Sequence, residues 1–182
     1  IAPVKPMLLE GLKATGSLQD VSTTIAYLGA NTLSEIKNYN RVKAIANTLG
    51  FQVDSILVDE FESWKTGFTM AQVYDLVIIG SNSGIENWNT SQATTTAAQL
   101  TRKLSVTNHE WMMPYAAIGY TKIPEEQGEW AAASAIAILG GVKAIDIPLV
   151  TNRRWDTWIN KKLLDIPNLE ISDLMLNSAK QY

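Results

Sequence analysis

The stretch that decides the fold runs from Thr107 to Gly141 and reads TNHEWMMPYAAIGYTKIPEEQGEWAAASAIAILGG. It opens on a polar and aromatic turn, continues as a short apolar strand from Ala116 to Tyr120, and ends in a helix. Pro124 suits the first turn of that helix, where an N–H group has no partner within the helix. Gly140-Gly141 is typical of a helix end. The Ala, Ile and Leu residues of its body predict a mostly buried helix. A polar turn followed by a packed helix is a suitable wall for a ligand cleft.

The rest of the chain alternates short apolar strands with helices. The predicted strands cover residues 21–28, 51–58, 74–79, 104–106 and 147–150. The predicted helices cover residues 4–14, 33–49, 60–70, 91–103, 154–164 and 171–179. This alternation predicts an α/β fold with a doubly wound parallel sheet. The helix at 33–49 has an apolar stripe at helical spacing, which predicts that its inner face is formed by Ile36, Tyr39, Val42, Ile45, Ala46 and Leu49.

Composition excludes several classes of function. The chain has 182 residues, a net charge of −3, one histidine and no cysteine. The charge gives no basic footprint for nucleic acid, and the missing cysteines exclude disulfides and Cys-based zinc sites. The sequence contains no dinucleotide-binding, phosphate-loop, zinc-protease or serine-hydrolase motif. The sequence therefore offers no candidate catalytic residue, and we expect no metal and no cofactor.

Ligands of open parallel sheets bind beyond the carboxyl ends of the strands. That rule selects the predicted loops at 29–34, 80–89 and 107–115. All three carry hydroxyl or amide groups, and the loops at 80–89 and 107–115 add aromatic residues, a mixture that suits a small polar ligand with an apolar part. The candidate ligand-binding residues are Asn31, Thr32, Ser81, Asn82, Ser83, Asn87, Trp88, Glu110, Trp111 and Tyr115.

Most of these residues also have an ordinary structural interpretation. Thr32 can cap the following helix with Glu35 as its partner in a capping box, and Trp88 can pack as a lid on the sheet edge. Glu110 can pair with a ligand amine or face solvent, and Trp111 can stack on a ligand or join the core. Both interpretations stay open for each residue. The pair Arg153-Arg154 is more typical of a solvated helix start than of a carboxylate clamp.

Three stretches together resemble a known family. They are Thr107–Gly141, Asp75–Trp88 (DLVIIGSNSGIENW) and Asp146–Leu164 (DIPLVTNRRWDTWINKKLL). In order and spacing they look like substrate-binding proteins of ABC transporters, of the type I periplasmic-binding-protein family. The resemblance implies a Rossmann-like lobe of a hinge-bending receptor that captures a small polar or aromatic ligand, such as an amino acid, in an interlobe cleft. It also implies a membrane permease as partner and a receptor with no chemistry of its own, so that we expect a protein that is not an enzyme. The same fold serves as an extracytoplasmic ligand-sensing domain of membrane signalling proteins, which is the alternative.

The resemblance also implies a division of the chain. Residues 1–182 would be the C-terminal portion of a two-lobed protein, with the lobe core at about 15–117, a hinge-crossing segment of the other lobe at 118–150, and return helices at 151–182. Trp130, Ile136 and Leu139 would then expose apolar surface and favour self-association of the fragment. The implied location is periplasmic or extracellular, and a lipid anchor on the whole protein is compatible with it.

Overall fold

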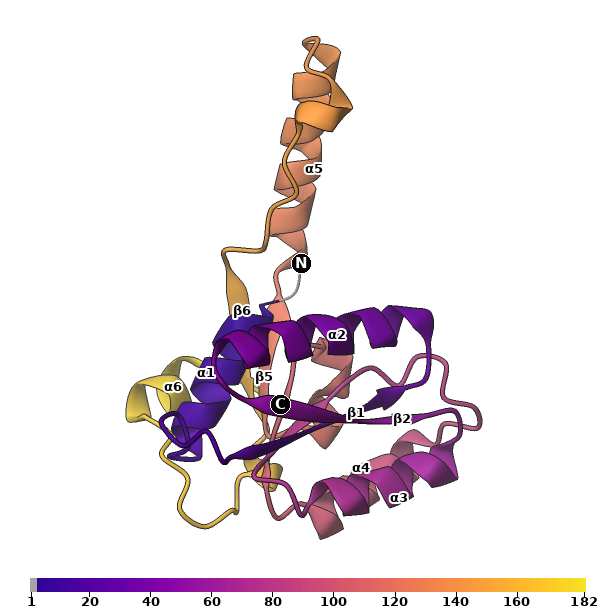
Figure 1. Cartoon of the computed structure of the whole chain (residues 1–182), viewed down its shortest axis with the longest axis vertical. Helices are drawn as coiled ribbons and strands as arrows, with labels where there is room; N and C mark the ends of the chain where they lie inside the picture. The colour runs from indigo at the N-terminus through magenta and orange to yellow at the C-terminus, as the bar shows by residue number, and fades with distance from the viewer. Residues whose placement is uncertain (1–2) are drawn as a thin grey trace.

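The computed structural model describes residues 3–182 and contains a seven-stranded sheet with helices on both faces (Figure 1). In chain order the helices and strands are α1 (Val4–Ala14), β1 (Thr24–Ala30), α2 (Leu33–Thr48), β2 (Gln52–Val58), α3 (Phe61–Ala71), β3 (Leu76–Ile79), α4 (Thr90–Leu100), β4 (Leu104–Thr107), η1 (Glu110–Tyr115), β5 (Ile118–Lys122), α5 (Pro124–Leu139), η2 (Ala144–Asp146), β6 (Trp155–Ile159), η3 (Lys161–Leu163), α6 (Asp173–Ser178) and β7 (Lys180–Gln181).

The sheet has the strand order β2-β1-β3-β4-β5-β6-β7. Strands β1 to β5 are parallel, as the alternation of strands and helices predicted. The edge differs, because β6 runs antiparallel to β5 and places Trp158 opposite Gly119. The short β7 is parallel to β6. The α/β class is thus confirmed, with a sheet that is mostly rather than wholly parallel.

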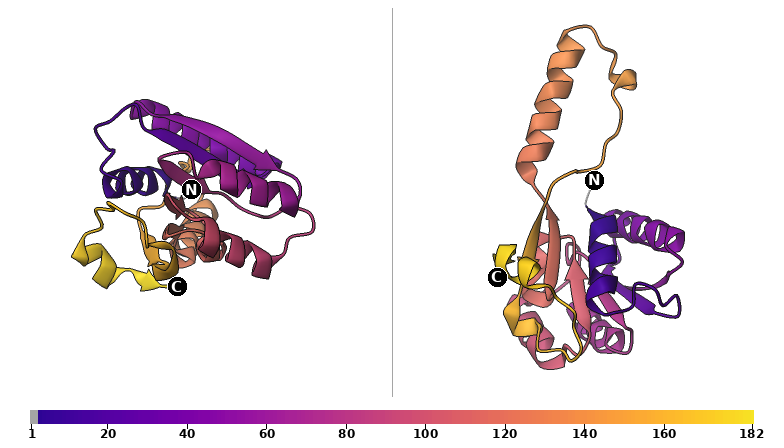
Figure 2. Two further views of the ribbon diagram at one scale, coloured as in Figure 1. Left: turned by 90° about the horizontal axis from the view of Figure 1, so that it is seen from below. Right: turned by 90° about the vertical axis from the view of Figure 1, so that its left-hand side faces the viewer.

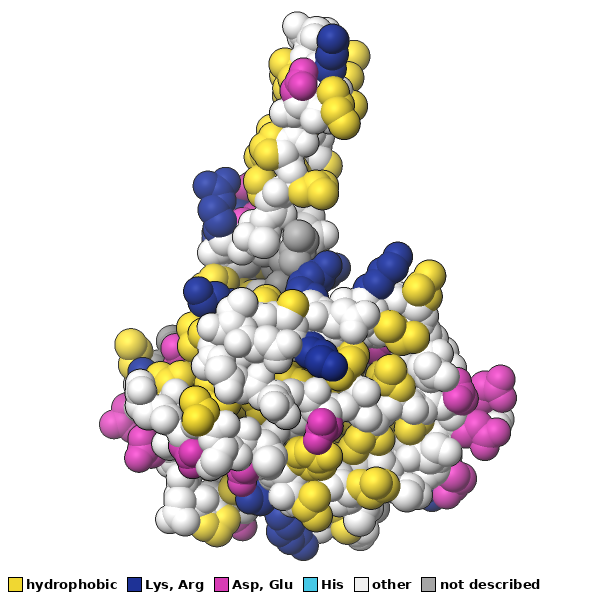
Figure 3. Space-filling view, viewed as in Figure 1, with side chains coloured by type: hydrophobic (Ala, Val, Ile, Leu, Met, Phe, Trp, Pro, Cys, Tyr) yellow, Lys and Arg dark blue, Asp and Glu magenta, His cyan; other side chains and the backbone are white. Residues whose placement is uncertain are grey.

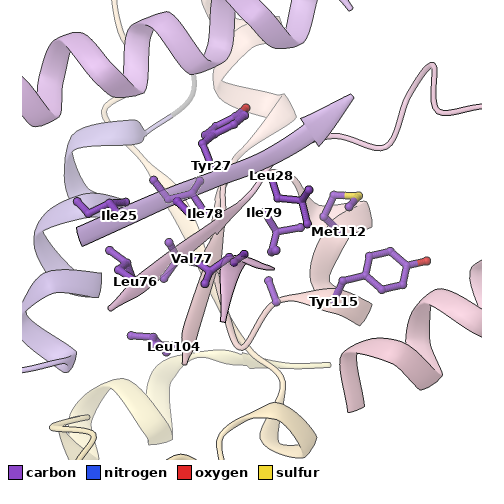
Figure 4. Packing of buried hydrophobic residues seen from close by; sticks show 14 of the residues in the cluster. Ile25, Tyr27, Leu28, Leu76, Val77, Ile78, Ile79, Leu104, Met112 and Tyr115 are labelled. Carbon is purple, nitrogen blue, oxygen red and sulfur yellow. The ribbon is translucent and has the colours of Figure 1, made fainter. Parts of the chain in front are cut away.

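Helices α1 and α2 cover one face of the sheet, and α3 and α4 cover the other. Every residue of β3 is buried between these layers. Figure 4 shows Leu28, Ile78 and Ile79 among the side chains that fill the core. Because such strands are buried on both faces, they read as continuous apolar runs rather than as an alternating pattern.

Residues 124–154, here called the arm, project away from the sheet (Figure 2). The arm consists of α5, η2 and the chain that returns to β6. No residue of α5 is buried, so the prediction of a buried helix is wrong. Leu139 is 88% exposed and Ile136 71% exposed, and apolar side chains run along the arm in Figure 3. Burial requires a facing element, and within residues 3–182 the only chain beside α5 is the return segment. No helix of that described range, α5 included, is long and apolar enough to span a bilayer.

Two predicted elements, one within the return segment of the arm and one directly after it, are also wrong. Residues 147–150 form no strand, because they run beside α5 and have no strand to pair with. The predicted helix at 154–164 is instead strand β6 followed by the short η3. Its tryptophans at positions 155 and 158 fit helical spacing, but pairing with β5 along all five residues of β6 fixes the segment as a strand.

Helix α2 packs through only part of the predicted face: Val42 and Ala46 are buried as predicted, and Tyr39, Ile45 and Leu49 pack against the core while only partly buried. Its buried residues are Glu35, Asn38, Val42 and Ala46, whereas Ile36 and Tyr39 are only half-buried. The helix therefore presents a polar first half and an apolar second half to the sheet. A buried carboxylate and a buried amide need hydrogen-bonding partners, and both find them at the carboxyl edge of the sheet.

Candidate functional site

The three predicted loops lie along one edge of the sheet, because β1, β3 and β4 are parallel and end there. The first two loops are joined by backbone hydrogen bonds. Ala30 N–H donates to the Ser81 carbonyl at 2.9 Å, and Asn31 N–H donates to the Val58 carbonyl at 2.8 Å. Glu86 N–H donates to the Asp59 carbonyl at 2.7 Å. These bonds hold the loops in a fixed arrangement.

The loops at 29–34 and 80–89 bring five of the candidate residues together: Asn31, Thr32, Ser81, Asn82 and Ser83. The Thr32 hydroxyl caps α2 by accepting a hydrogen bond from Glu35 N–H at 3.4 Å. Gly84 has φ +100° and packs so closely on the Thr32 methyl group that a Cβ would overlap it. Asn31 and Ser83 are exposed, so their polar atoms face outward from this edge. The cap is therefore present, and it leaves polar groups of both loops open to a ligand.

Trp88 and Tyr115 belong to an aromatic cluster beneath the loops. The ring centroid of Trp88 lies 4.9 Å from that of Trp64, 5.4 Å from Phe61 and 5.4 Å from Tyr115. Tyr115 is 2% exposed. Trp88 is half-buried and covers the cluster, as the lid interpretation describes. These two side chains support the loops and offer a ligand little surface in this arrangement of the chain.

Asn87 lies in the same loop as Trp88 but outside the aromatic cluster. It is exposed and adopts a left-handed backbone conformation with φ 54°. Its side chain lines a hollow of about 180 Å³ together with Glu60, Glu62 and Gln92. The structure therefore separates Asn87 from the other candidates.

The remaining two candidates, Glu110 and Trp111, lie on η1 beside a larger hollow. Trp111 is 52% exposed, and its indole packs against the His109 ring with centroids 4.6 Å apart. The hollow has a volume of about 600 Å³, comparable to that of small-molecule sites. It is lined by Asn108, Glu110, Trp111, Pro114, Thr121, Lys122, Pro124, Trp158 and Tyr182. Trp158, Lys122 and Tyr182 were not among the predicted site residues.

A buried polar network connects the three loops, and no local sequence pattern predicted it. Glu35 is 3% exposed and accepts hydrogen bonds from the Tyr27 hydroxyl and from Ser81 N–H, the latter at 2.9 Å. Its other carboxylate oxygen lies 3.8 Å from His109 Nε2. Asn38 Nδ2 donates to the Tyr27 hydroxyl at 2.8 Å. The network therefore links α2, the loop after β3 and the turn that carries Trp111.

Asn108 completes the network on the side of the hollow. Its Nδ2 donates to Asn38 Oδ1 at 3.1 Å, and Asn108 is also a lining residue of the hollow. The glycines at 29 and 80 leave room for the network, since a Cβ at Gly80 would overlap the Glu35 carboxylate and lie 2.8 Å from the Tyr27 hydroxyl. The hydrogen bond between Asn108 and Asn38 thus ties the turn before η1 to helix α2.

Electrostatics in the network favour a charged Glu35. Burial alone raises the pKa of this carboxyl, but the neighbouring His109 ring, 3.8 Å away, and hydrogen bonds from Tyr27 and Ser81 N–H outweigh burial and lower it. Burial and the neighbouring Glu35 charge raise the pKa of Tyr27. Glu35 is thus held as an anion, and Tyr27 stays protonated and donates to it.

The hollow beside η1 presents charged side chains to a ligand. Among residues 3–182 no group of three or more His, Cys, Asp or Glu side chains lies close enough to hold a metal ion. The exposed Glu110 and Lys122 line the hollow, and neither has an ion-pair partner within the described chain. The hollow therefore offers aromatic surface and one free charge of each sign.

A second hollow, of about 660 Å³, lies within the arm between α5 and the return segment. Here Glu126 accepts hydrogen bonds from Arg153 N–H at 2.9 Å and Arg154 N–H at 3.2 Å, which lower its pKa. Arg154 also pairs with Glu129 at 2.8 Å. The two arginines therefore start no helix, and their backbone anchors the return segment to α5.

Comparison with known proteins gives likeness in structure alone. No family model matches the chain, and no curated protein matches it either. A solved ABC domain in complex with L-Trp from Streptococcus pneumonia matches with a TM-score of 0.62 and 18% identity, over 99% of this chain and 62% of that one. A ligand-free, open substrate-binding protein with adhesive properties from Clostridium difficile has a TM-score of 0.64 and 16% identity, over 94% and 58%. A conserved domain protein from Vibrio cholerae has a TM-score of 0.60 and 15% identity, over 100% and 60%.

The chain thus has the fold of solved substrate-binding proteins, as the resemblance in sequence implied. It spans between 58% and 62% of the length of these three structures. The matches include the arm, since they cover 94% to 100% of the chain.

Proposed function

We propose that this chain is part of the solute-binding component of an ABC transporter and captures a small ligand at the carboxyl edge of its sheet. The observation that carries the proposal is the exposed indole of Trp111, which stands over a hollow of about 600 Å³ at that edge. An exposed tryptophan held by a ring contact and a buried network is preorganised for stacking, because little conformational entropy is lost on binding. The fold of solved substrate-binding proteins supports the same function.

The lining of the hollow favours an amino acid with an apolar or aromatic side chain. Glu110 can accept hydrogen bonds from an ammonium group, and Lys122 can pair with a carboxylate. The aromatic residues supply apolar area for a side chain. The similar structure solved with L-Trp is compatible with this class of ligand. The polar groups of Asn31, Thr32, Asn82 and Ser83 add further partners along the edge. Ser81 is buried, and its hydroxyl accepts a hydrogen bond from Ser83 N–H at 3.0 Å, so it supports the loop instead.

The arm belongs, in our proposal, to the other lobe of a two-lobed receptor. Residues 118–150 would cross the hinge, and 151–182 would return to the lobe whose core lies at about 15–117. Two observations support this: α5 buries no residue here, and the similar solved chains are longer than this one. The receptor would close by hinge rotation, deliver its ligand to a membrane permease, and work outside the cytoplasm.

A thermal-shift screen of the intact two-lobed receptor tests the function. The panel contains amino acids, sugars, nucleosides and small carboxylates. A ligand that binds only the native state stabilises it by about 2.7 kcal/mol at a hundredfold excess over its dissociation constant. We expect the melting temperature to rise with ligands of one chemical class only, and we expect that class to be the amino acids. An unchanged melting temperature across the panel would contradict solute capture from these classes.

A further inference from the structure

The return strand β6 supplies an aromatic residue to the same hollow as η1, although β6 begins forty residues after η1 ends. Trp158 lies on the face of β6 that turns toward the hollow, and Trp111 approaches the hollow from η1. In β6 side chains alternate between the two faces of the sheet, so Trp155 lies on the opposite face. Only the folded sheet brings the indoles of Trp111 and Trp158 to one cavity.

The position of Trp158 is fixed by several independent contacts. Its Nε1–H donates to the hydroxyl of buried Thr121 on β5 at 3.0 Å. Lys180 Nζ lies 5.1 Å from its ring centroid and forms an ion pair with Asp156 at 2.6 Å. Opposite Trp158, Gly119 lets the two strands pack closely, because an added Cβ there would lie 3.3 Å from Trp158 Cβ. The hydrogen bond from its Nε1–H and the cation–π contact with Lys180 restrict the half-buried indole to one orientation.

We propose that Trp158 is a specificity-determining residue of the ligand site, forming with Trp111 the apolar walls that receive the flat part of the ligand. This inference rests on the proposed function and deepens it. Because Trp158 is held by the sheet, it sets the position of the ligand's apolar group, and the preorganised indole of Trp111 packs against that group from η1. The charged ends of the ligand then meet Glu110 and Lys122 at the rim.

Fluorine NMR on the intact receptor tests the placement. Tryptophan is replaced by 5-fluorotryptophan, and the resonances of the two residues are assigned with Trp111→Phe and Trp158→Phe variants. The probes are L-tryptophan, L-phenylalanine, L-leucine, adenosine and glucose, each also followed by melting temperature. We expect every probe that raises the melting temperature to shift both resonances. A stabilising probe that shifts Trp111 alone, or neither residue, overturns the role of Trp158 and leaves solute binding standing. If all probes leave the melting temperature and both resonances unchanged, the proposed function fails, and this inference fails with it.

Variants test the energetic role of Trp158. We expect Trp158→Leu to lower the affinity for the stabilising probe on the order of tenfold, because one aromatic contact is lost. Trp155→Leu, on the same strand and 39% exposed, is the matched control and should bind as the wild type. Trp158→Phe keeps a ring but loses the donor to Thr121, and should retain a preference for aromatic over aliphatic probes. Equal affinity of Trp158→Leu and Trp155→Leu, or an unaltered ranking of probes in Trp158→Leu, would overturn the proposal.

Discussion

The sheet with its covering helices and the arm contain similar apolar segments. In the first region these segments are buried, and in the arm they are exposed. Helix α4, rich in Thr and Ala, buries Ala93 and Ala97, while the more apolar α5 buries nothing. Strand β3 is buried along its whole length, while the predicted strand at 147–150 pairs with nothing. The difference lies in the facing elements, not in the residues. An apolar pattern predicts that a segment can be buried against another element. Whether the segment is buried depends on whether a facing element lies beside it in the folded chain.

The largest contrast concerns a tryptophan in each region. Trp64 is fully buried in the aromatic cluster, so Trp64→Ala should lower the free energy of unfolding by about 3–5 kcal/mol. Trp130 on α5 is 37% exposed, and Trp130→Ala should change it by less than about 1 kcal/mol. Urea unfolding of this chain measures both. Equal destabilisation by the two variants would show that the arm is packed in solution.

A glycine in each region gives the next contrast. Gly80→Ala would force a Cβ into the Glu35 carboxylate and should cost about 1–3 kcal/mol. At Gly128, inside α5, no atom lies within 4 Å of an added Cβ. Gly128→Ala should therefore increase helix content and cost nothing, because alanine favours a helix over glycine by about 1 kcal/mol. Circular dichroism with urea unfolding measures both effects, and a stable Gly80→Ala would rule out the close packing around Glu35.

The pH dependence of stability isolates the buried network. The pKa of Glu35 is lower in the folded state than its ordinary value of 4.5, so its contribution is present above pH 4.5 and is lost as the pH falls through the folded pKa. Glu35→Gln keeps an oxygen acceptor but cannot titrate. We expect the wild type to lose more stability than Glu35→Gln between pH 5 and the folded pKa, measured by urea unfolding. Parallel profiles would mean that Glu35 is not held as a buried anion.

At the candidate site the effect should fall on binding and spare stability. Trp111 is exposed, so Trp111→Ala should leave the melting temperature of the ligand-free receptor nearly unchanged and weaken ligand binding on the order of tenfold. Calorimetry of the intact receptor measures the affinity. Val73→Ala is a suitable control. Val73 is 79% exposed and lies between α3 and the start of β3, at the opposite end of the strands from the candidate loops. Full affinity in Trp111→Ala would remove this residue from the site.

The weakest expected effect is association through the arm. If its apolar surface lacks a partner, isolated chains should associate at high concentration, and Ile136→Glu with Leu139→Glu should prevent this. Sedimentation velocity at increasing concentration compares the two proteins. A wild-type chain that stays monomeric at every concentration would contradict an unpartnered arm.

The sequence predicted the parts of the fold that depend on local pattern. The bounds of α1 are as predicted, and β2, β3 and β4 begin and end within two residues of their predicted limits. The segment Trp155–Ile159 was misassigned because its apolar residues fit both helical and alternating spacing. Only pairing with β5, more than thirty residues earlier, distinguishes the two, and that information is absent from the segment itself.

The candidate site was predictable to a similar extent and for the same reason. The rule for parallel sheets found the loops that carry Asn31, Ser81 and Trp111. It did not find Trp158, because strand β6 was expected to be a helix. The buried Glu35 was visible only as a capping residue, since the partners that make its burial favourable lie on β1 and after β3 and β4. A sequence pattern does not show hydrogen bonds between distant segments.

Amide hydrogen exchange of the intact receptor, with and without the ligand found in the screen, tests the central claim most directly. Solute capture at the carboxyl edge predicts ligand-dependent protection in the loops at 29–34, 80–89 and 107–115 and in β6. Exchange at the opposite end of the strands should stay unchanged. Protection that avoids these loops, or that falls only on the far end of the sheet, would contradict a ligand site at this edge.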